Sequence, residues 1–172
     1  MSRRARGKDA EFRDELVRLL PRLRRFALSL TGDLDKADDL VQAACVRALS
    51  RRHQWRDGSR LDSWMFKIIH RLMIDTSRAM RVRAPHFRLE EERFVAKTGN
   101  IMRKVEAKWS LGKVAAAMRK MTVDERLILS LVCIDGMSYR HAAETLQIPV
   151  GTVMSRLARA RKKLHRLVAA SH

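Results

Sequence analysis

Hydrophobic residues recur at spacings of three and four along most of the chain, and no run of alternating apolar and polar positions competes with them. A repeat of this kind is typical of amphipathic helices, in which one stripe of side chains faces a core. The pattern therefore predicts an all-α protein.

Three helices are predicted in residues 1–84. The first ends at Gly32, a helix-stop signal, and Pro21 is expected to kink or divide it. The second should run from residue 33 or 35 to about 52, and the third from about 60–81. The expected core face of the first helix is Leu16, Leu19, Leu20, Leu23, Ala27 and Leu30. That of the second is Ala37, Leu40, Val41, Ala44, Cys45, Ala48 and Leu49, and that of the third includes Trp64, Ile68 and Leu72.

The last part of the chain begins a new helical pattern. Thr122 and Glu125 have the spacing of a capping box, and the helix that they start should end at Asp135-Gly136. A further helix is predicted before it, at about 106–118.

Residues 135–164 have the pattern of a helix-turn-helix. A short helix at Ser138 is followed by a turn at 147–149 and by a second helix with one apolar stripe, made of Val153, Leu157, Ala160, Leu164 and Leu167. The other faces carry Arg, Lys, Ser and Thr with no acidic residue, as expected for a helix that lies in the major groove of DNA. The alternative is a solvated basic helix without a partner.

The architecture predicted from these elements is two small helical bundles joined by a flexible linker, the second containing the helix-turn-helix. The expected boundaries are 10–84, 85–105 for the linker and 106–172. The linker assignment rests on a Pro, a Gly and an acidic run in a segment whose charges nearly balance.

Charge adds a partner to this picture. The chain has 37 Lys+Arg against 19 Asp+Glu, a formal net charge of +18. Such an excess predicts a polyanionic partner and binding that weakens steeply with salt. No catalytic constellation, metal-ligand spacing or phosphate-binding glycine loop is visible, so we expect no enzyme activity, no cofactor and no metal. Neither a signal peptide nor a membrane span is recognisable, which predicts a cytoplasmic protein without membrane insertion.

The two cysteines, Cys45 and Cys133, each lie on an apolar helical stripe. We expect both to be buried, reduced thiols.

Four places in the chain resemble, in the right order, the extracytoplasmic-function (ECF) sigma factors of bacterial RNA polymerase. Residues 38–49 (DDLVQAACVRAL) resemble region 2.2, and residues 63–75 (SWMFKIIHRLMID) resemble regions 2.3 and 2.4. Residues 121–126 (MTVDER) and 135–139 (DGMSY) resemble the start of region 4. Residues 149–164 (PVGTVMSRLARARKKL) resemble the recognition helix of region 4.2.

The resemblance implies a role for each surface. Binding to core RNA polymerase is expected at Asp38, Asp39, Gln42, Val46 and Arg47. Recognition and melting of the minus-ten element are expected at Trp55, Arg56, Arg60, His70, Arg71, Arg78 and Arg81. In the helix that reads the minus-thirty-five element, base contacts are expected from Ser155, Arg156 and Arg159, and phosphate contacts from Thr152, Lys162, Lys163 and Arg166. An anti-sigma factor is a further partner that the resemblance implies.

Three positions depart from the family pattern. His70-Arg71 stands where Arg-Asn is usual, which puts the base preference at the minus-ten element in question, because Arg offers only donors. His141 replaces a Glu that would complete a capping box with Ser138. Met154 replaces a frequent Lys or Arg, and so removes one possible polar contact to DNA.

Two other functions are compatible with parts of the pattern. A sigma-like decoy would keep both bundles and sequester an anti-sigma factor, and the His70-Arg71 departure favours it. An ordinary helix-turn-helix regulator would leave the resemblances at 38–49 and 63–75 unexplained.

Overall fold

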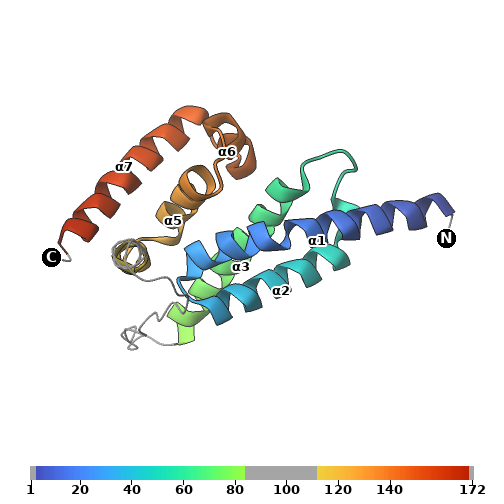
Figure 1. Cartoon of the computed structure of the whole chain (residues 1–172), viewed down its shortest axis with the longest axis horizontal. Helices are drawn as coiled ribbons and strands as arrows, with labels where there is room; N and C mark the ends of the chain where they lie inside the picture. Colours follow the sequence, from blue (N-terminus) through green and yellow to red (C-terminus); the bar gives the residue numbers. More distant parts are fainter. Residues whose placement is uncertain (1–2, 84–111, 171–172) are drawn as a thin grey trace, which may run out of the picture.

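The computed structural model describes residues 3–83 and 112–170, with side chains for 7–76 and 112–170. Every regular element in these ranges is helical, so the predicted all-α fold is confirmed (Figure 1). The elements are α1 (Arg3–Thr31), α2 (Leu34–Ser50), a 3-10 turn η1 (Arg52–Gln54), α3 (Leu61–Arg83), a helical stretch at 112–119, α5 (Val123–Leu129), a π-helical turn η2 (Ser130–Ile134), α6 (Tyr139–Leu146) and α7 (Val150–Ala169). The predicted linker and the first residues of the helix predicted at 106–118 lie outside the described residues.

Helix α1 is a single helix of 29 residues that contains Pro21. Pro21 was expected to kink or divide this segment, but the helix continues through it. Buried neighbours on both sides, Leu16 and Leu23, hold the two halves in one core, and this packing outweighs the missing backbone hydrogen bond. The helix ends where predicted: Gly32 has a φ of 69°, and its N–H donates to the Leu28 carbonyl at 2.8 Å.

Helix α2 begins at the cap residue Asp33, whose side chain accepts from the Lys36 N–H at 2.8 Å. The predicted core face is confirmed at five positions: Ala37, Leu40, Val41, Ala44 and Ala48. It is wrong at Leu49, which is 46% exposed, and Cys45 is only half-buried. At 100° per residue these two positions lie on the edge of the stripe, where the neighbouring helices no longer cover them.

Helix α3 buries the large side chains of Met65, Phe66 and Ile69 against α1, which contributes Phe12 and Phe26. The Phe66 ring packs on Phe26 of α1 with 4.4 Å between ring centroids. Trp64, which was expected in the core, is partly buried against it, and its ring centroid lies 6.3 Å from that of Phe12.

The capping box predicted at the start of α5 is confirmed. The Thr122 side chain accepts from the Glu125 N–H, and the Glu125 side chain accepts from the Thr122 N–H at 2.9 Å. The helix ends at Asp135-Gly136 as predicted, through the π-helical turn η2, in which the Asp135 N–H donates to the Ser130 carbonyl at 2.8 Å.

Neither cysteine is fully buried, so that prediction is wrong. Cys133 is exposed because it faces outward on η2, where its Sγ atom lies 3.5 Å from the Arg161 guanidinium. Partial burial raises the pKa of the Cys45 thiol, which keeps that thiol protonated at neutral pH.

The predicted helix-turn-helix is formed by α6 and α7. Ser138 caps α6 by accepting from the His141 N–H at 3.2 Å, and Gln147 ends α6 in the left-handed region with a φ of 56°. In α7 the residues Val153, Leu157 and Ala160 are buried, and Leu164 and Leu167 are partly buried against the same core. The opposite side of α7 is left to solvent.

The two helical groups, α1–α3 and α5–α7, are packed against each other (Figure 1). Their buried hydrophobic residues form one contiguous cluster, in which η2 and α5 contact α1, and α6 contacts α3. Both groups therefore share a core in this arrangement.

Candidate nucleic-acid and protein interfaces

A shallow concave patch follows the outer side of α2. Its lining includes Asp39, Gln42, Val46 and Arg47, four of the five residues predicted to bind the polymerase. Val46 is 63% exposed, although it is an apolar residue on a helix whose other face is buried. Singly exposed apolar residues are common on protein surfaces, so what distinguishes Val46 is its place in the concave lining of this patch.

The fifth predicted residue, Asp38, is directed toward α1. Its carboxylate accepts from the Arg24 guanidinium at 2.6 Å, and both side chains are about half exposed. The structure therefore places Asp38 at the border of the α2 patch.

The residues predicted to act at the minus-ten element are not gathered on one open surface. Trp55 is half-buried, with its ring centroid 5.3 Å from that of Phe12. The Arg52 guanidinium lies 4.8 Å from the ring centres of both Trp55 and Phe12. These contacts fix Trp55 in the packing of the loop, whereas Arg56 is fully open to solvent.

The rest of the minus-ten set lies at Arg60, directly before α3, and on α3 itself. Arg60 is exposed and donates to the Asp62 carboxylate at 2.8 Å, while His70 lies 3.4 Å from Asp124 at the start of α5. Arg71 is exposed. Arg78 and Arg81 belong to the last turns of α3, but their side chains lie outside the described residues.

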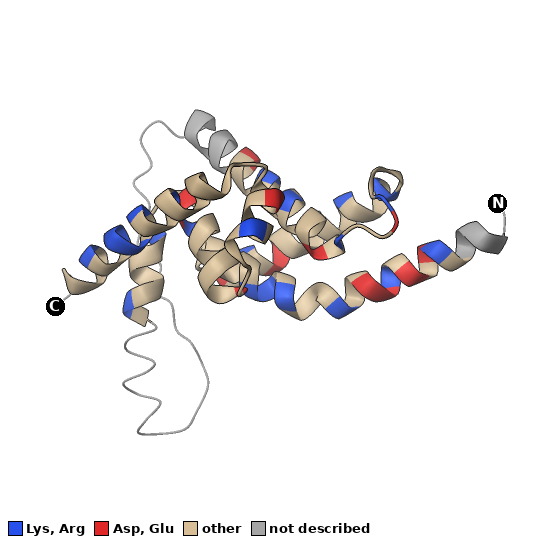
Figure 2. Cartoon of the chain, turned by 90° about the horizontal axis from the view of Figure 1, so that it is seen from above, with Lys and Arg blue, Asp and Glu red and all other residues tan. Residues whose placement is uncertain are grey.

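Helix α7 presents most of its predicted DNA-binding residues to solvent. Ser155, Arg156, Arg159, Lys162 and Arg166 are exposed, and Thr152 is partly exposed. Basic residues lie on α7 from Arg156 to Arg166, and Figure 2 shows several of them on this helix. A row of exposed cations of this kind suits contact with phosphate groups.

Lys163 differs from the other cations of α7. Its ammonium group donates to Glu125 Oε2 at 2.7 Å, so it is paired with the carboxylate of the capping box. Burial is the largest influence on the pKa of Glu125 and would raise it. The hydrogen bonds from Lys163 and from the Thr122 backbone outweigh burial, so the pKa is lowered.

The surfaces predicted for the minus-ten and minus-thirty-five elements meet in one cavity of about 170 Å³ between the two helical groups. Lys67, His70 and Arg71 of α3 line it from one side, and Arg156 of α7 lines it from the other. We call this packing of α1–α3 against α5–α7 the closed arrangement. It covers part of both cationic surfaces.

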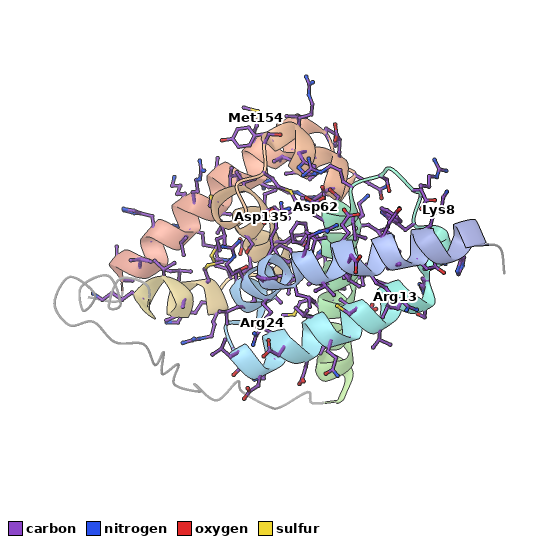
Figure 3. All side chains as sticks on the ribbon, turned by 45° about the vertical axis from the view of Figure 1, so that its right-hand side comes forward. Lys8, Arg13, Arg24, Asp62, Asp135 and Met154 are labelled. Carbon is purple, nitrogen blue, oxygen red and sulfur yellow. The ribbon has the colours of Figure 1, made fainter. Side chains whose placement is uncertain are left out.

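A buried group of charges joins α1, α3 and the end of η2. Arg22 donates to both oxygens of Asp135 at 2.6 Å and to Asp62 at 2.7 Å. The carboxylates are only 8% (Asp62) and 6% (Asp135) exposed, and Figure 3 shows both between the two groups. We call Arg22, Asp62 and Asp135 the interdomain charge cluster.

The charges of this cluster are set by its hydrogen bonds. The pKa of Arg22 is raised, mainly by its hydrogen bond with Asp135. Burial is the largest influence on Asp62 and would raise its pKa, but donors from Arg60, the Ser63 backbone and Arg22 together lower it. Arg22 and Asp62 are therefore both ionised at neutral pH.

Further hydrogen bonds join the two helical groups beside the interdomain charge cluster. Ser63 of α3 and His141 of α6 form a hydrogen bond of 2.7 Å, and Thr145 donates to the same hydroxyl at 3.2 Å. Ser29 of α1 donates to Ser130 at 2.7 Å. His141, which cannot complete a capping box, thus joins the two groups.

Sequence reasoning missed this set of interdomain contacts. The only signal was a charged residue, Arg22, within a helical turn of the buried Leu23 and Phe26. A single charge at the edge of an apolar stripe does not identify its partner.

Two family models match the chain, one on each helical group. Residues 16–70 match the sigma2 domain of PhyR, and residues 111–164 match sigma-70 region 4. The chain belongs to the ECF RNA polymerase sigma factors.

The individual relatives agree with this assignment. The chain is 36% identical over 156 residues to the ECF RNA polymerase sigma factor EcfG of Rhodopseudomonas palustris, which covers 91% of this chain and 84% of the relative. Among solved structures, it is similar to the sigma factor RpoE of Bartonella quintana in complex with the anti-sigma factor NepR. That likeness has a TM-score of 0.72 and 30% identity, and covers 94% of this chain and 99% of RpoE. CnrH in complex with the cytosolic domain of CnrY gives a TM-score of 0.67 at 26% identity, over 94% of this chain and 89% of CnrH.

None of the helices described here combines the length and the apolar character needed to cross a bilayer.

Proposed function

We propose that this protein is an alternative sigma factor that binds core RNA polymerase through α2 and directs initiation at promoters recognised by α3 and α7. The observation that carries the proposal is the pairing of two surfaces in one chain. One is the concave patch on α2, which combines charges of both signs, Asp39 and two arginines, with the exposed Val46. The other is the exposed cationic face of a helix-turn-helix. An apolar side chain among charges of both signs suits a protein partner, whereas a row of cations without acidic residues suits DNA.

The closed arrangement implies a change of shape on the promoter. The minus-ten and minus-thirty-five elements are centred about 25 base pairs apart, which is roughly 85 Å of B-DNA. His70 and Arg156 line one small cavity, so they cannot reach both elements together. We infer that the two helical groups separate on the polymerase. Segment 84–111 is covalently long enough for this, at roughly 3.3–3.6 Å per extended residue.

An anti-sigma factor is the partner that we propose for control. Of the similar solved structures, RpoE is in complex with the anti-sigma factor NepR, and CnrH is in complex with the cytosolic domain of CnrY. The cytoplasm is the proposed site of action, where the polymerase works, and no catalytic activity of the chain itself is proposed. The decoy alternative is not favoured, because the curated relatives are sigma factors and α7 keeps an exposed cationic surface that a decoy does not need.

The polymerase-binding assignment predicts the effect of a single charge on α2. Val46→Glu should weaken binding to core RNA polymerase at least tenfold, because it places a second carboxylate in the centre of the patch. Val17→Glu on α1 is the matched control, since Val17 is 62% exposed and Val46 63%, and Val17 is not among the residues that line the patch. Titration of labelled protein with core polymerase measures both. Equal affinities for the two variants would contradict the assignment.

A further inference from the structure

The exposed side of the recognition helix α7 is not uniformly polar. Met154 is 53% exposed and Val150 is 40% exposed, and Ala158, one turn further along, is exposed too. Their spacing of four residues places them in one row, which we call the apolar strip. Figure 3 shows Met154 at the outer surface, on the end of α7 that follows the turn.

The surroundings of the apolar strip indicate its partner. Ser155 and Arg159, both exposed, lie beside it on the helix, and α7 carries no acidic residue. A protein partner would have to accept this dense positive charge, whereas DNA is complementary to it. The first turns of a recognition helix also enter the major groove most deeply. The apolar strip therefore faces base edges when α7 is docked.

The major groove offers one apolar group to such a strip, the C5-methyl of thymine. Met154 suits it, because an unbranched thioether side chain adapts to the position of a methyl group. It carries no strong donor, so it has nothing to offer the acceptors of guanine that Arg or Lys would bind.

We propose that Met154 reads a thymine methyl group in the minus-thirty-five element, with Val150 completing the apolar contact. Met154 is then a specificity-determining residue in addition to the polar set on α7. The proposal rests on the proposed function and names one feature of the promoter that this chain selects.

The test begins with selection. Holoenzyme reconstituted with core polymerase is given a promoter library with a randomised minus-thirty-five element, and wild type, Met154→Leu and Met154→Lys are compared. We expect wild type and Met154→Leu to enrich thymine at the same position. Met154→Lys should lose that preference there while the other positions stay unchanged. Unchanged selection by Met154→Lys would overturn the proposal.

A second measurement alters the DNA and not the protein, so its first result, obtained with the wild type, does not depend on the folding of any variant. Deoxyuridine replaces the selected thymine, which removes only the methyl group. Holoenzyme affinity should fall about fourfold, the effect expected for one buried carbon. Met154→Ala holoenzyme should bind both DNAs equally. An equal response of wild type and Met154→Ala would overturn the proposal.

The two proposals fail in different ways. If wild-type holoenzyme selects no promoter at all, the sigma-factor function fails, and this inference fails with it. If promoters are selected but their binding is indifferent to the methyl group, only the role of Met154 is wrong.

Discussion

At the scale of single residues, the cations of α7 fall into two kinds. Arg156 and Arg159 are exposed, while Lys163 is held by Glu125 of the capping box. A side chain that already has a carboxylate partner must break that pair to reach DNA. The paired lysine is therefore better suited to hold α7 on α5, and to approach phosphates, than to distinguish bases.

This difference predicts unequal effects of two alanine substitutions. Arg156→Ala should lower the ratio of transcription from cognate over scrambled minus-thirty-five sequences about tenfold, because a base contact from Arg is worth about 1–3 kcal/mol of discrimination. Lys163→Ala should leave that ratio nearly unchanged and lower the unfolding free energy by up to about 1 kcal/mol, since the ion pair is only partly buried. Equal losses on both sequences for Arg156→Ala would contradict its assignment.

At the scale of elements, periodicity predicted the helices well and their edges less well. The stripe on α2 and the capping box at Thr122 were found because both depend on local spacing alone. Leu49 and Cys133 were misplaced because the covered width of a helix depends on neighbours that sequence does not reveal. Pro21 was misjudged for the same reason, since packing on both sides keeps α1 whole.

The candidate surfaces show the same division. The row of exposed cations on α7 follows from its pattern, and four of the five residues predicted on α2 line one patch. The sequence could not show that the residues of the minus-ten set lie apart. The Trp55 ring packs on Phe12 and His70 lies beside Asp124, and both partners are distant in sequence.

At the scale of the whole molecule, the interdomain charge cluster is the main polar link between the two groups. Arg22 bonds to two carboxylates that are each less than a tenth exposed. Removing Arg22 takes the guanidinium partner from the buried carboxylate of Asp135, which is destabilising, whereas Asp62 keeps its bond from Arg60. Arg22 therefore controls how firmly the closed arrangement is held.

Arg22→Ala should open the molecule. We expect a larger radius of gyration in small-angle X-ray scattering, and a loss of about 3 kcal/mol from the closed arrangement. Arg24→Ala is the matched control, because the Arg24–Asp38 pair is exposed to solvent and does not join the two groups. An unchanged radius of gyration for Arg22→Ala would show that the closed arrangement does not depend on this charge cluster.

The same cluster predicts a pH dependence. The pKa of Asp62 is lower in the folded protein than in the unfolded chain, so its contribution is fully present above the unfolded value of about 3.9. It is lost as the pH falls below that value toward the folded pKa. The contribution of Asp62 to the closed arrangement should accordingly be constant between about pH 6 and 8 and be lost only in acid, where scattering across a pH series should show opening.

The central claim, that this chain directs promoter-specific initiation, is tested most directly by run-off transcription on fragments of the source genome. Core polymerase is assayed with and without the protein, and a housekeeping sigma factor shows that the core is active. The account predicts new transcripts that share two upstream motifs, one near minus ten and one near minus thirty-five. No new transcripts from active core polymerase would contradict it and favour the decoy instead.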